Sequence, residues 1–179
     1  MPPFTCANCG VSIEGKPVLC PTCGAPPALA GRWWLAEKIG SGAFGTTWRA
    51  EGEQGAAAVK EIPLARLDRK GRALLEREIE VLHSLPHPCI PALHEALTTG
   101  DGERRRAWLA MDFVPGRTLR AEMSAERHGL PEALAILAGV AEVLAYLHEL
   151  TPPVIHRDLK PENLIRHARS GRWWLVDFG

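Results

Sequence analysis

The stretch His156-Arg157-Asp158-Leu159-Lys160-Pro161-Glu162-Asn163 places a carboxylate, a cation and an amide at fixed offsets in one short segment. The Asp158 carboxylate is suited to accept a proton from an attacking hydroxyl group. The Lys160 ammonium is suited to neutralise a phosphoryl group in transfer, and the Asn163 amide oxygen to bind a divalent cation. Because phosphoryl transfer depends mainly on positioning and charge neutralisation, the stretch predicts a phosphoryl-transfer loop. The alternative is an ordinary charged loop after a helix.

This loop resembles the catalytic loop of protein kinases, H-R-D-x-x-x-x-N, and matches it at every fixed position. A lysine two residues after the aspartate, here Lys160, is similar to the serine/threonine branch of the family rather than the tyrosine branch. The resemblance implies transfer of the ATP γ-phosphate to Ser or Thr hydroxyls of a protein substrate. It makes Asp158 the base and Lys160 the residue that neutralises the phosphate.

Asp177-Phe178-Gly179 follows Asn163 by fourteen residues. At that distance it resembles the kinase D-F-G element. The resemblance implies that Asp177 and Asn163 bind the Mg²⁺ that accompanies ATP.

Glycines occupy the fixed positions of Gly-x-Gly-x-x-Gly in the stretch Gly40-Ser41-Gly42-Ala43-Phe44-Gly45. The same pattern occurs in dinucleotide-binding folds, where a helix follows it. Here the β-branched and aromatic run 46–50 predicts a strand, so the loop joins a hairpin. Its backbone N–H groups are then able to close over a triphosphate. The stretch resembles the kinase glycine-rich loop, with Thr47 in place of the usual valine over adenine.

Ala57-Ala58-Val59-Lys60 is similar to the kinase strand V-A-I-K. The resemblance implies that Ala58 belongs to the ATP site and that Lys60 contacts the α- and β-phosphates. A lysine at the end of an apolar strand is otherwise an ordinary solvated end.

Residues 68–84 have the apolar spacing of an amphipathic helix. Glu78 on this helix lies ten residues before Pro88. At that offset the kinase family keeps the glutamate that pairs with the strand lysine, so Glu78 is expected to orient Lys60. Glu76 and Glu80 lie nearby, and the alternative is that all three carboxylates are solvated.

The apolar run 107–114 predicts a buried strand, and its end resembles the kinase hinge. The resemblance implies that Met111 is the gatekeeper and that the Asp112 carbonyl and the Val114 N–H face adenine. Thr118 lies where a ribose contact is usual. A buried strand without a ligand is the alternative.

Pro131 begins a long helix in which Leu137, Ala141, Leu144 and His148 share one stripe. This helix is well placed to lead into the catalytic loop. We expect its apolar stripe to be partly exposed, since the sequence ends at the D-F-G element, before the helices that cover this stripe in kinases.

Two knuckles, Cys6-Ala7-Asn8-Cys9 and Cys20-Pro21-Thr22-Cys23, lie near the beginning of the chain. Each is followed by glycine, and together they supply the four thiolates of a tetrahedral site, as in a zinc ribbon. Residues 11–13 and 17–19 suit a hairpin between the knuckles. A structural Zn²⁺ is expected, because so short a segment cannot fold on its own core and four cysteines leave no open position for catalysis. Two reversible disulfides or a disordered tail are the alternatives.

Composition is that of a soluble globular protein, with 46% apolar and 23% charged residues among 179. The zero net charge implies no bulk attraction to nucleic acid or to an anionic membrane. No signal peptide or membrane span is recognised, so we expect a cytoplasmic protein with reduced cysteines. The fifth cysteine, Cys89, is expected to be a small buried apolar side chain.

The sequence therefore predicts an α+β chain: a zinc ribbon and stiff linker at 1–28, then a protein kinase domain at 29–179. A small lobe of antiparallel sheet and one helix is expected at about 29–115, and the beginning of a helical large lobe at about 116–179. ATP, Mg²⁺ and structural Zn²⁺ are the expected cofactors. The partners are a Ser/Thr-containing protein and, as a further candidate, a second chain that completes the large lobe.

Because the activation segment is absent from these residues, we expect little or no kinase activity from this polypeptide alone. A module that binds nucleotide or a partner without catalysis, or a gene fragment of a kinase, is the alternative reading. The intact Lys60, Asp158, Asn163 and Asp177 argue against a decayed active site.

Overall fold

A computed structural model describes residues 3–42, 45–125 and 127–178. The chain forms two compact units, which we describe separately. The first contains Met1–Ile79 and Leu93–Phe113, and the second contains Glu80–Ala92 and Val114–Gly179.

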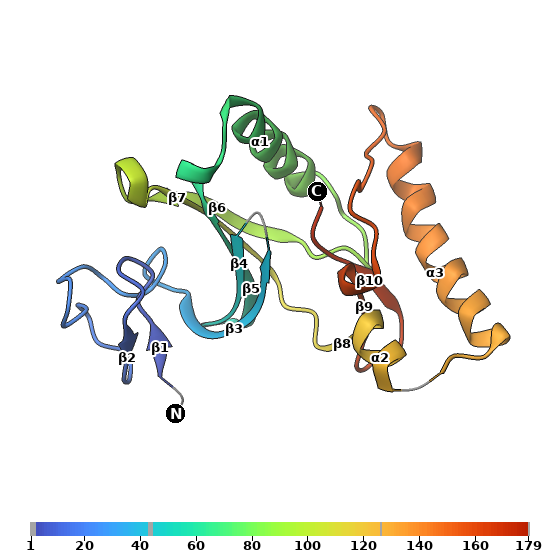
Figure 1. Ribbon diagram of the computed structural model, residues 1–179, viewed down its shortest axis with the longest axis horizontal. Coiled ribbons are helices and arrows are strands. Elements are labelled where there is room, and N and C mark those ends of the chain that lie inside the picture. The colour runs from blue at the N-terminus through green and yellow to red at the C-terminus, as the bar shows by residue number, and fades with distance from the viewer. Residues whose placement is uncertain (1–2, 43–44, 126, 179) are drawn as a thin grey trace. The chain divides into compact units, whose positions relative to one another are not determined.

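The first unit is built on an antiparallel sheet of seven strands in the order β2-β1-β3-β4-β5-β7-β6 (Figure 1). β3 and β4 form the expected hairpin around the glycine-rich loop, and β5 contains the apolar run that ends at Lys60. The strands are β1 (Phe4–Thr5), β2 (Ser12–Ile13), β3 (Trp34–Gly42), β4 (Gly45–Gly52), β5 (Gly55–Pro63), β6 (Leu93–Thr99) and β7 (Arg106–Asp112).

Helix α1 (Arg69–His83) supplies apolar side chains to the core of this sheet. Leu75 is buried among Ile62 of β5 and Leu109 of β7, and Ile79 packs at the margin of the same cluster. The helical spacing of these residues agrees with the amphipathic pattern of the sequence, because positions four apart share one face of a helix. Two short 3-10 helices, η1 (Leu64–Arg66) and η2 (Gly102–Arg104), complete the unit.

The cysteine-rich segment pairs differently from the hairpin that the sequence predicted. Strand β2 pairs with β1, with Phe4 opposite Ile13, and residues 17–19 form no strand. Pro17 lacks the N–H that a central ladder position needs, and Val18 is exposed. The expected hairpin between 11–13 and 17–19 is therefore wrong.

The segment that follows the knuckles is packed rather than free. Pro27 is fully buried and its carbonyl accepts a hydrogen bond from Ala7 N–H at 2.9 Å. Ala28 and Leu29 are buried as well. The predicted stiff linker is thus a fixed part of the first unit.

The second unit contains two helices and a sheet of three strands in the order β10-β9-β8. Strands β9 and β10 form a hairpin directly after the catalytic loop, with Leu164 opposite Leu175. The elements are β8 (Gly116–Thr118), α2 (Leu119–Ala125), α3 (Leu130–Glu149), the 3-10 helix η3 (Pro161–Asn163), β9 (Leu164–His167) and β10 (Trp173–Leu175).

Helix α3 is apolar on two faces. The buried face differs from the predicted stripe and comprises Ile136, Val140, Val143 and Leu147. Leu137, on the stripe that was predicted, is 64% exposed. An 18-residue window of α3 with mean hydropathy 1.7 is long and apolar enough to cross a membrane. This single helix is weak evidence for a span, because core helices of soluble proteins meet the same criterion.

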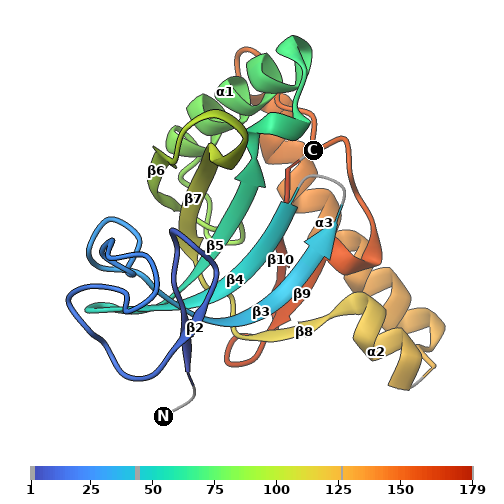
Figure 2. The ribbon, with the colours of Figure 1, turned by 60° about the vertical axis from the view of Figure 1, so that its left-hand side comes forward.

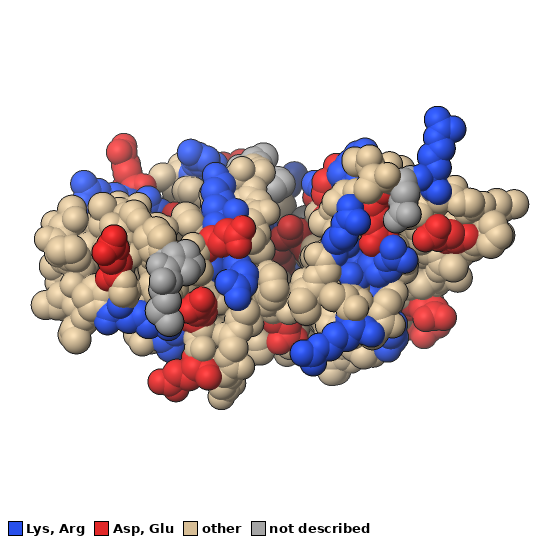
Figure 3. Space-filling view, turned by 90° about the horizontal axis from the view of Figure 1, so that it is seen from below, with Lys and Arg blue, Asp and Glu red and all other residues tan. Residues whose placement is uncertain are grey.

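Charged side chains of both signs are interspersed on the face of the molecule shown in Figure 3. This mixture agrees with the zero net charge of the sequence.

Candidate functional site

The catalytic loop of the second unit holds Asp158 between a cation and an amide. Lys160 Nζ donates a hydrogen bond to Asp158 Oδ2 at 2.6 Å. Asn163 Nδ2 donates to the same oxygen at 3.0 Å and to the Asp158 carbonyl at 2.8 Å. Helix η3, with Pro161 in its first turn, fixes the spacing between these groups. The three residues that the sequence assigned to this loop therefore meet at one carboxylate.

Hydrogen bonds also join the loop to the segment that carries Asp177. His156 is buried, its Nε2 lies 3.1 Å from the Val176 carbonyl, and its ring packs 4.7 Å from that of Phe178. Val176 N–H donates to the Asn163 carbonyl at 3.0 Å. Asp177 has a φ of +56°, in a region that residues with a side chain rarely adopt. Such backbone strain is typical of functional sites, where surrounding contacts hold it in place. Gly179 lies outside the described residues.

The pKa values of the loop follow from these contacts. The hydrogen bond from Lys160 lowers the pKa of Asp158, and the bond from Asn163 acts in the same direction. The Lys160 pKa is raised, first by its bond to Asp158 and further by the negative charges of Glu162 and Asp177. At neutral pH the loop therefore presents an ionised carboxylate next to a protonated amine.

The Asn163 side chain is oriented for a cation. Because its amide nitrogen donates twice to Asp158, the amide oxygen is the atom that remains for a ligand. Carboxylate and amide oxygens are the donors that Mg²⁺ prefers. Asn163 and Asp177 therefore offer the donor types that the magnesium site implied by the sequence requires.

In the first unit, the predicted nucleotide residues lie in a row across three strands. Gly40 of β3 is opposite Thr47 of β4, and Thr47 is opposite Lys60 of β5. Lys60 Nζ donates to Glu78 Oε1 at 3.3 Å, and the two side chains are only 12% and 17% exposed. Of the three glutamates considered from the sequence, Glu78 is thus the one that pairs with Lys60.

Other predicted nucleotide residues lie on β5, on β7 or in the segment 114–118 that follows β7. Ala58 is directly opposite Met111, and the Asp112 carboxylate lies 2.8 Å from His94 Nε2. Val114 begins the longer segment of the second unit, Val114–Gly179, and is buried. The Thr118 hydroxyl accepts a hydrogen bond from Ala121 N–H at 3.1 Å, so it stabilises the beginning of α2. The remaining predicted positions are Ser41 and Gly42, at the end of β3, Gly45, which begins β4, and Ala43 and Phe44, which lie outside the described residues.

The four knuckle cysteines form one cluster. Their sulfur atoms all lie within 4.8 Å of one another. Cys6 Sγ and Cys23 Sγ are 3.9 Å apart, and Cys9 Sγ and Cys20 Sγ are 3.8 Å apart. A tetrahedral site with Zn–S bonds of about 2.3 Å requires sulfur separations of about 3.8 Å, so the cluster fits Zn²⁺. All five cysteines of the chain are free thiols, and the alternative of two disulfides is not what the structure contains.

Two of these thiols have strongly shifted pKa values. Burial raises the pKa of Cys6 to about 12. A hydrogen bond from the Asn8 amide, at 3.3 Å, lowers the pKa of Cys23 to about 6. The cluster therefore already favours one thiolate, the form that binds a metal.

One partly buried ion pair of the second unit was missed from the sequence. Glu122 of α2 is buried, and its Oε1 accepts a hydrogen bond from Arg166 Nε at 2.8 Å. Arg166 also lies over the Trp173 ring, 5.8 Å from its centroid. No spacing rule links residues 44 positions apart, so no local pattern of the sequence indicated this pair.

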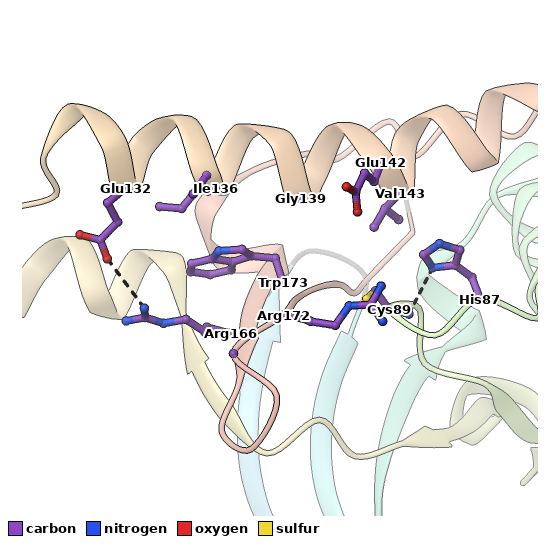
Figure 4. A pocket seen from close by; sticks show the side chains of 12 residues that line it. His87, Cys89, Glu132, Ile136, Gly139, Glu142, Val143, Arg166, Arg172 and Trp173 are labelled. Carbon is purple, nitrogen blue, oxygen red and sulfur yellow. Dashed lines mark hydrogen bonds and ion pairs between the residues drawn. The ribbon is translucent and has the colours of Figure 1, made fainter.

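A separate cavity of about 310 Å³ lies within the second unit, between α3 and β10. Figure 4 shows Trp173 below the helix, next to Gly139, with Glu132 near Arg166. The Glu132 and Arg166 charges are 3.7 Å apart. None of the predicted site residues lines this cavity, so it is distinct from the catalytic loop.

Comparison with known proteins agrees with the motifs. Residues 33–179 match the model of the protein kinase domain. The chain is 38% identical to serine/threonine-protein kinase ATG1a of Arabidopsis thaliana, over 79% of this chain and 22% of that protein. It is 34% identical to serine/threonine-protein kinase PkaB of Streptomyces coelicolor, over 76% of this chain and 32% of that protein. The chain thus spans less than half the length of these relatives.

A solved structure has the same fold. The kinase domain of PknI from Mycobacterium tuberculosis superposes with a TM-score of 0.67 at 30% sequence identity. The match covers 82% of this chain and 58% of the PknI chain. The catalytic loop, the Lys60–Glu78 pair, the family match and this likeness agree with one another: the chain belongs to the protein kinase family, within its serine/threonine branch.

Proposed function

We propose that this chain carries the Mg·ATP site and the catalytic residues of a kinase that transfers the γ-phosphate to serine or threonine hydroxyls of a protein substrate, with little or no transfer by this polypeptide alone. The observation that carries the proposal is the ionised Asp158 carboxylate, held between Lys160 and Asn163. A carboxylate so placed accepts the proton of an attacking hydroxyl, and the neighbouring ammonium compensates the charge of the phosphate.

The other residues bind and orient the nucleotide. Lys60, held by Glu78, contacts the α- and β-phosphates, and the backbone around Gly40 covers them. Met111, Asp112 and Val114 surround adenine. Asn163 and Asp177 would hold Mg²⁺, which when bound would supply charge neutralisation at the phosphates. Residues 29–115 form the small lobe in this proposal, and residues 116–179 form the beginning of the large lobe.

The four cysteines of residues 1–28 hold one structural Zn²⁺ in this proposal. Their sulfur separations support it, and a closed set of four thiolates leaves the metal no open position for catalysis. A site of this kind needs reduced cysteines, so we place the protein in the cytoplasm.

Calorimetric binding of Mg·ATP to the zinc-loaded chain tests the proposal. Lys60→Ala removes a charged contact with the phosphates and is expected to weaken binding at least tenfold, since such a contact contributes about 1.5–3 kcal/mol. Lys70→Ala is the matched control, because Lys70 is exposed on α1. Equal binding by the wild type and Lys60→Ala, or no binding by the wild type, contradicts the proposal.

A further inference from the structure

The cysteine-rich segment continues the seven-stranded sheet of the first unit. Strand β1 pairs antiparallel with β3, with Thr5 opposite Leu35, and so adds β1 and β2 to the edge of the sheet (Figure 2). The other edge of β3 pairs with β4, which begins at Gly45 of the glycine-rich loop. A single strand therefore contacts the cysteine-rich segment and, at its far end, carries Gly40, Ser41 and Gly42.

Two of the cysteines share their core with β3. Cys6 and Cys20 are buried in one apolar cluster with Phe4, against which Trp34 and Ala36 of β3 pack. The Phe4 and Trp34 rings are 5.5 Å apart. The order of the cysteine cluster and the order of β3 therefore depend on the same packing.

A lysine strengthens this connection. Lys16 Nζ lies 5.2 Å from the centroid of the Phe4 ring and 5.8 Å from that of Trp34. It also pairs with the Glu51 carboxylate of β4 at 3.6 Å. Lys16 comes from the turn between the knuckles, so the segment that positions the cysteines also contacts β3 and β4.

The other two cysteines face outward. Cys9 and Cys23 are exposed, whereas Cys6 and Cys20 are buried. Each knuckle thus contributes one ligand that solvent reaches and one ligand that is packed against the sheet. A metal held by this cluster would be reachable from solvent, and two of its ligands, Cys6 and Cys20, lie in the apolar cluster that packs against β3.

Strand β3 is irregular at two places. Its ladder with β4 shifts register between Leu35 and Glu37 and again between Lys38 and Gly40. Such shifts locally disrupt pairing. An edge strand without a covering partner is free to change its register and exposes unpaired N–H and C=O groups. Among the described residues, β1 is the only strand that pairs with the outer edge of β3.

We propose that the four-cysteine cluster is a zinc-dependent control site: zinc occupancy holds β3 in place and thereby sets the affinity of the sheet for Mg·ATP. The inference rests on the proposed nucleotide-binding function. Without zinc, the knuckles lose their order, Trp34 loses its cover, and the glycines at the end of β3 no longer keep their register.

The test compares a zinc-free variant with a control in the full chain. Cys9→Ser/Cys23→Ser removes the two exposed ligands and leaves the buried core residues unchanged. Cys89→Ala removes a cysteine outside the cluster.

Zinc content, calorimetric Mg·ATP binding and hydrogen exchange of residues 35–42 are measured for the wild type and for each variant. We expect one zinc per chain in the wild type and the control, none in the double variant, and an ATP dissociation constant in the double variant that is raised at least about fivefold. Exchange of residues 35–42 becomes faster.

If the double variant unfolds, Trp34→Ala provides a second test. Trp34→Ala leaves all four ligands in place but removes the contact of β3 with Phe4. It is expected to retain one zinc and to bind Mg·ATP more weakly than the wild type. Wild-type ATP affinity in a zinc-free double variant, or in Trp34→Ala, overturns the inference, as does a wild type that binds no zinc.

Failure of the nucleotide-binding proposal gives a different result. If the zinc-loaded wild type binds no Mg·ATP, the nucleotide-binding proposal is wrong. Hydrogen exchange of residues 35–42 then still tests whether zinc orders β3. Faster exchange of residues 35–42 in the double variant, with unchanged exchange in α3, supports coupling between the metal and β3. Equal exchange in the wild type and the double variant contradicts it.

Discussion

Asp158 illustrates how neighbours set the charge of a single residue. Its carboxylate accepts hydrogen bonds from Lys160 and Asn163, and both stabilise the ionised form over the protonated form. A proton acceptor must be ionised at the working pH. The lowered pKa of Asp158 keeps it ionised at neutral pH and moves its protonation to a lower pH.

Lys160→Ala is expected to raise the pKa of Asp158, because the largest stabilising contact of the carboxylate is lost. The carboxylate then becomes protonated at a higher pH than in the wild type, so any activity that needs its ionised form is lost earlier on acidification. Carbon-13 NMR titration of the Asp158 carboxyl group measures this shift without depending on activity. Lys70→Ala is the control, and an inflection that does not move in Lys160→Ala contradicts the prediction.

The Glu122–Arg166 pair gives a prediction about stability. The Glu122 side chain is 4% exposed and its Oε2 has no hydrogen-bond partner among the described residues. Arg166→Ala leaves this buried carboxylate without its main counterion, which is expected to lower the free energy of unfolding by about 1–3 kcal/mol. Urea unfolding followed by circular dichroism measures the change.

Arg120→Ala is the matched control for that prediction. Arg120 pairs with Glu162 at the same distance of 2.8 Å, but both side chains are exposed. An exposed pair contributes about 0–1 kcal/mol, so the control should change stability little. Adding Glu122→Leu to Arg166→Ala removes the unpaired charge and should recover part of the loss. Equal effects of Arg166→Ala and Arg120→Ala contradict the argument from burial.

At the scale of elements, the turn between β3 and β4 depends on one particular glycine. Gly45 has a φ of +151°, and a Cβ atom there would overlap the Glu61 carbonyl oxygen. Gly42, at the other side of the turn, has open space around the same position. Gly45→Ala is therefore expected to lower the free energy of unfolding by about 1–3 kcal/mol. Gly42→Ala should remain within about 0.5 kcal/mol of the wild type. Thermal and urea unfolding test the pair, and equal loss in both variants contradicts the prediction.

The sequence predicted features that lie within a few consecutive residues and missed pairing between distant segments. The catalytic loop and the strand with Lys60 are recognisable because their chemistry lies within a few consecutive residues. The pairing of Thr5 with Leu35 depends on a contact between distant segments, which no local pattern encodes. The hairpin predicted between the knuckles was wrong for the same reason: β2 finds its partner in β1, a strand of only two residues.

The sequence of helix α3 does not indicate which of its apolar faces is buried. Because apolar residues occur on more than one face, their period does not say which face is buried. The structure buries the line of Val140 and Val143 and leaves the neighbouring line exposed. The sequence did predict that part of the apolar surface would remain exposed, as Leu137 is.

For the molecule as a whole, the exposed line of α3 is expected to govern solution behaviour. Leu130, Leu134 and Leu137 are 74%, 56% and 64% exposed and lie at successive turns of one helix. Neighbouring exposed apolar side chains of this kind form a patch that promotes association. The zero net charge provides no long-range repulsion to oppose it.

Leu134→Lys/Leu137→Lys places two positive charges in this patch. Binding of an environment-sensitive apolar dye and the sedimentation-measured association of the chain should both decrease. Secondary structure should be retained, because neither side chain belongs to the buried line of α3. Leu74→Lys is the control, since Leu74 is 43% exposed on α1, outside this patch. If the control reduces association as much as the double variant, general charge rather than the α3 surface determines the behaviour. If neither variant changes it, the apolar line of α3 does not drive association.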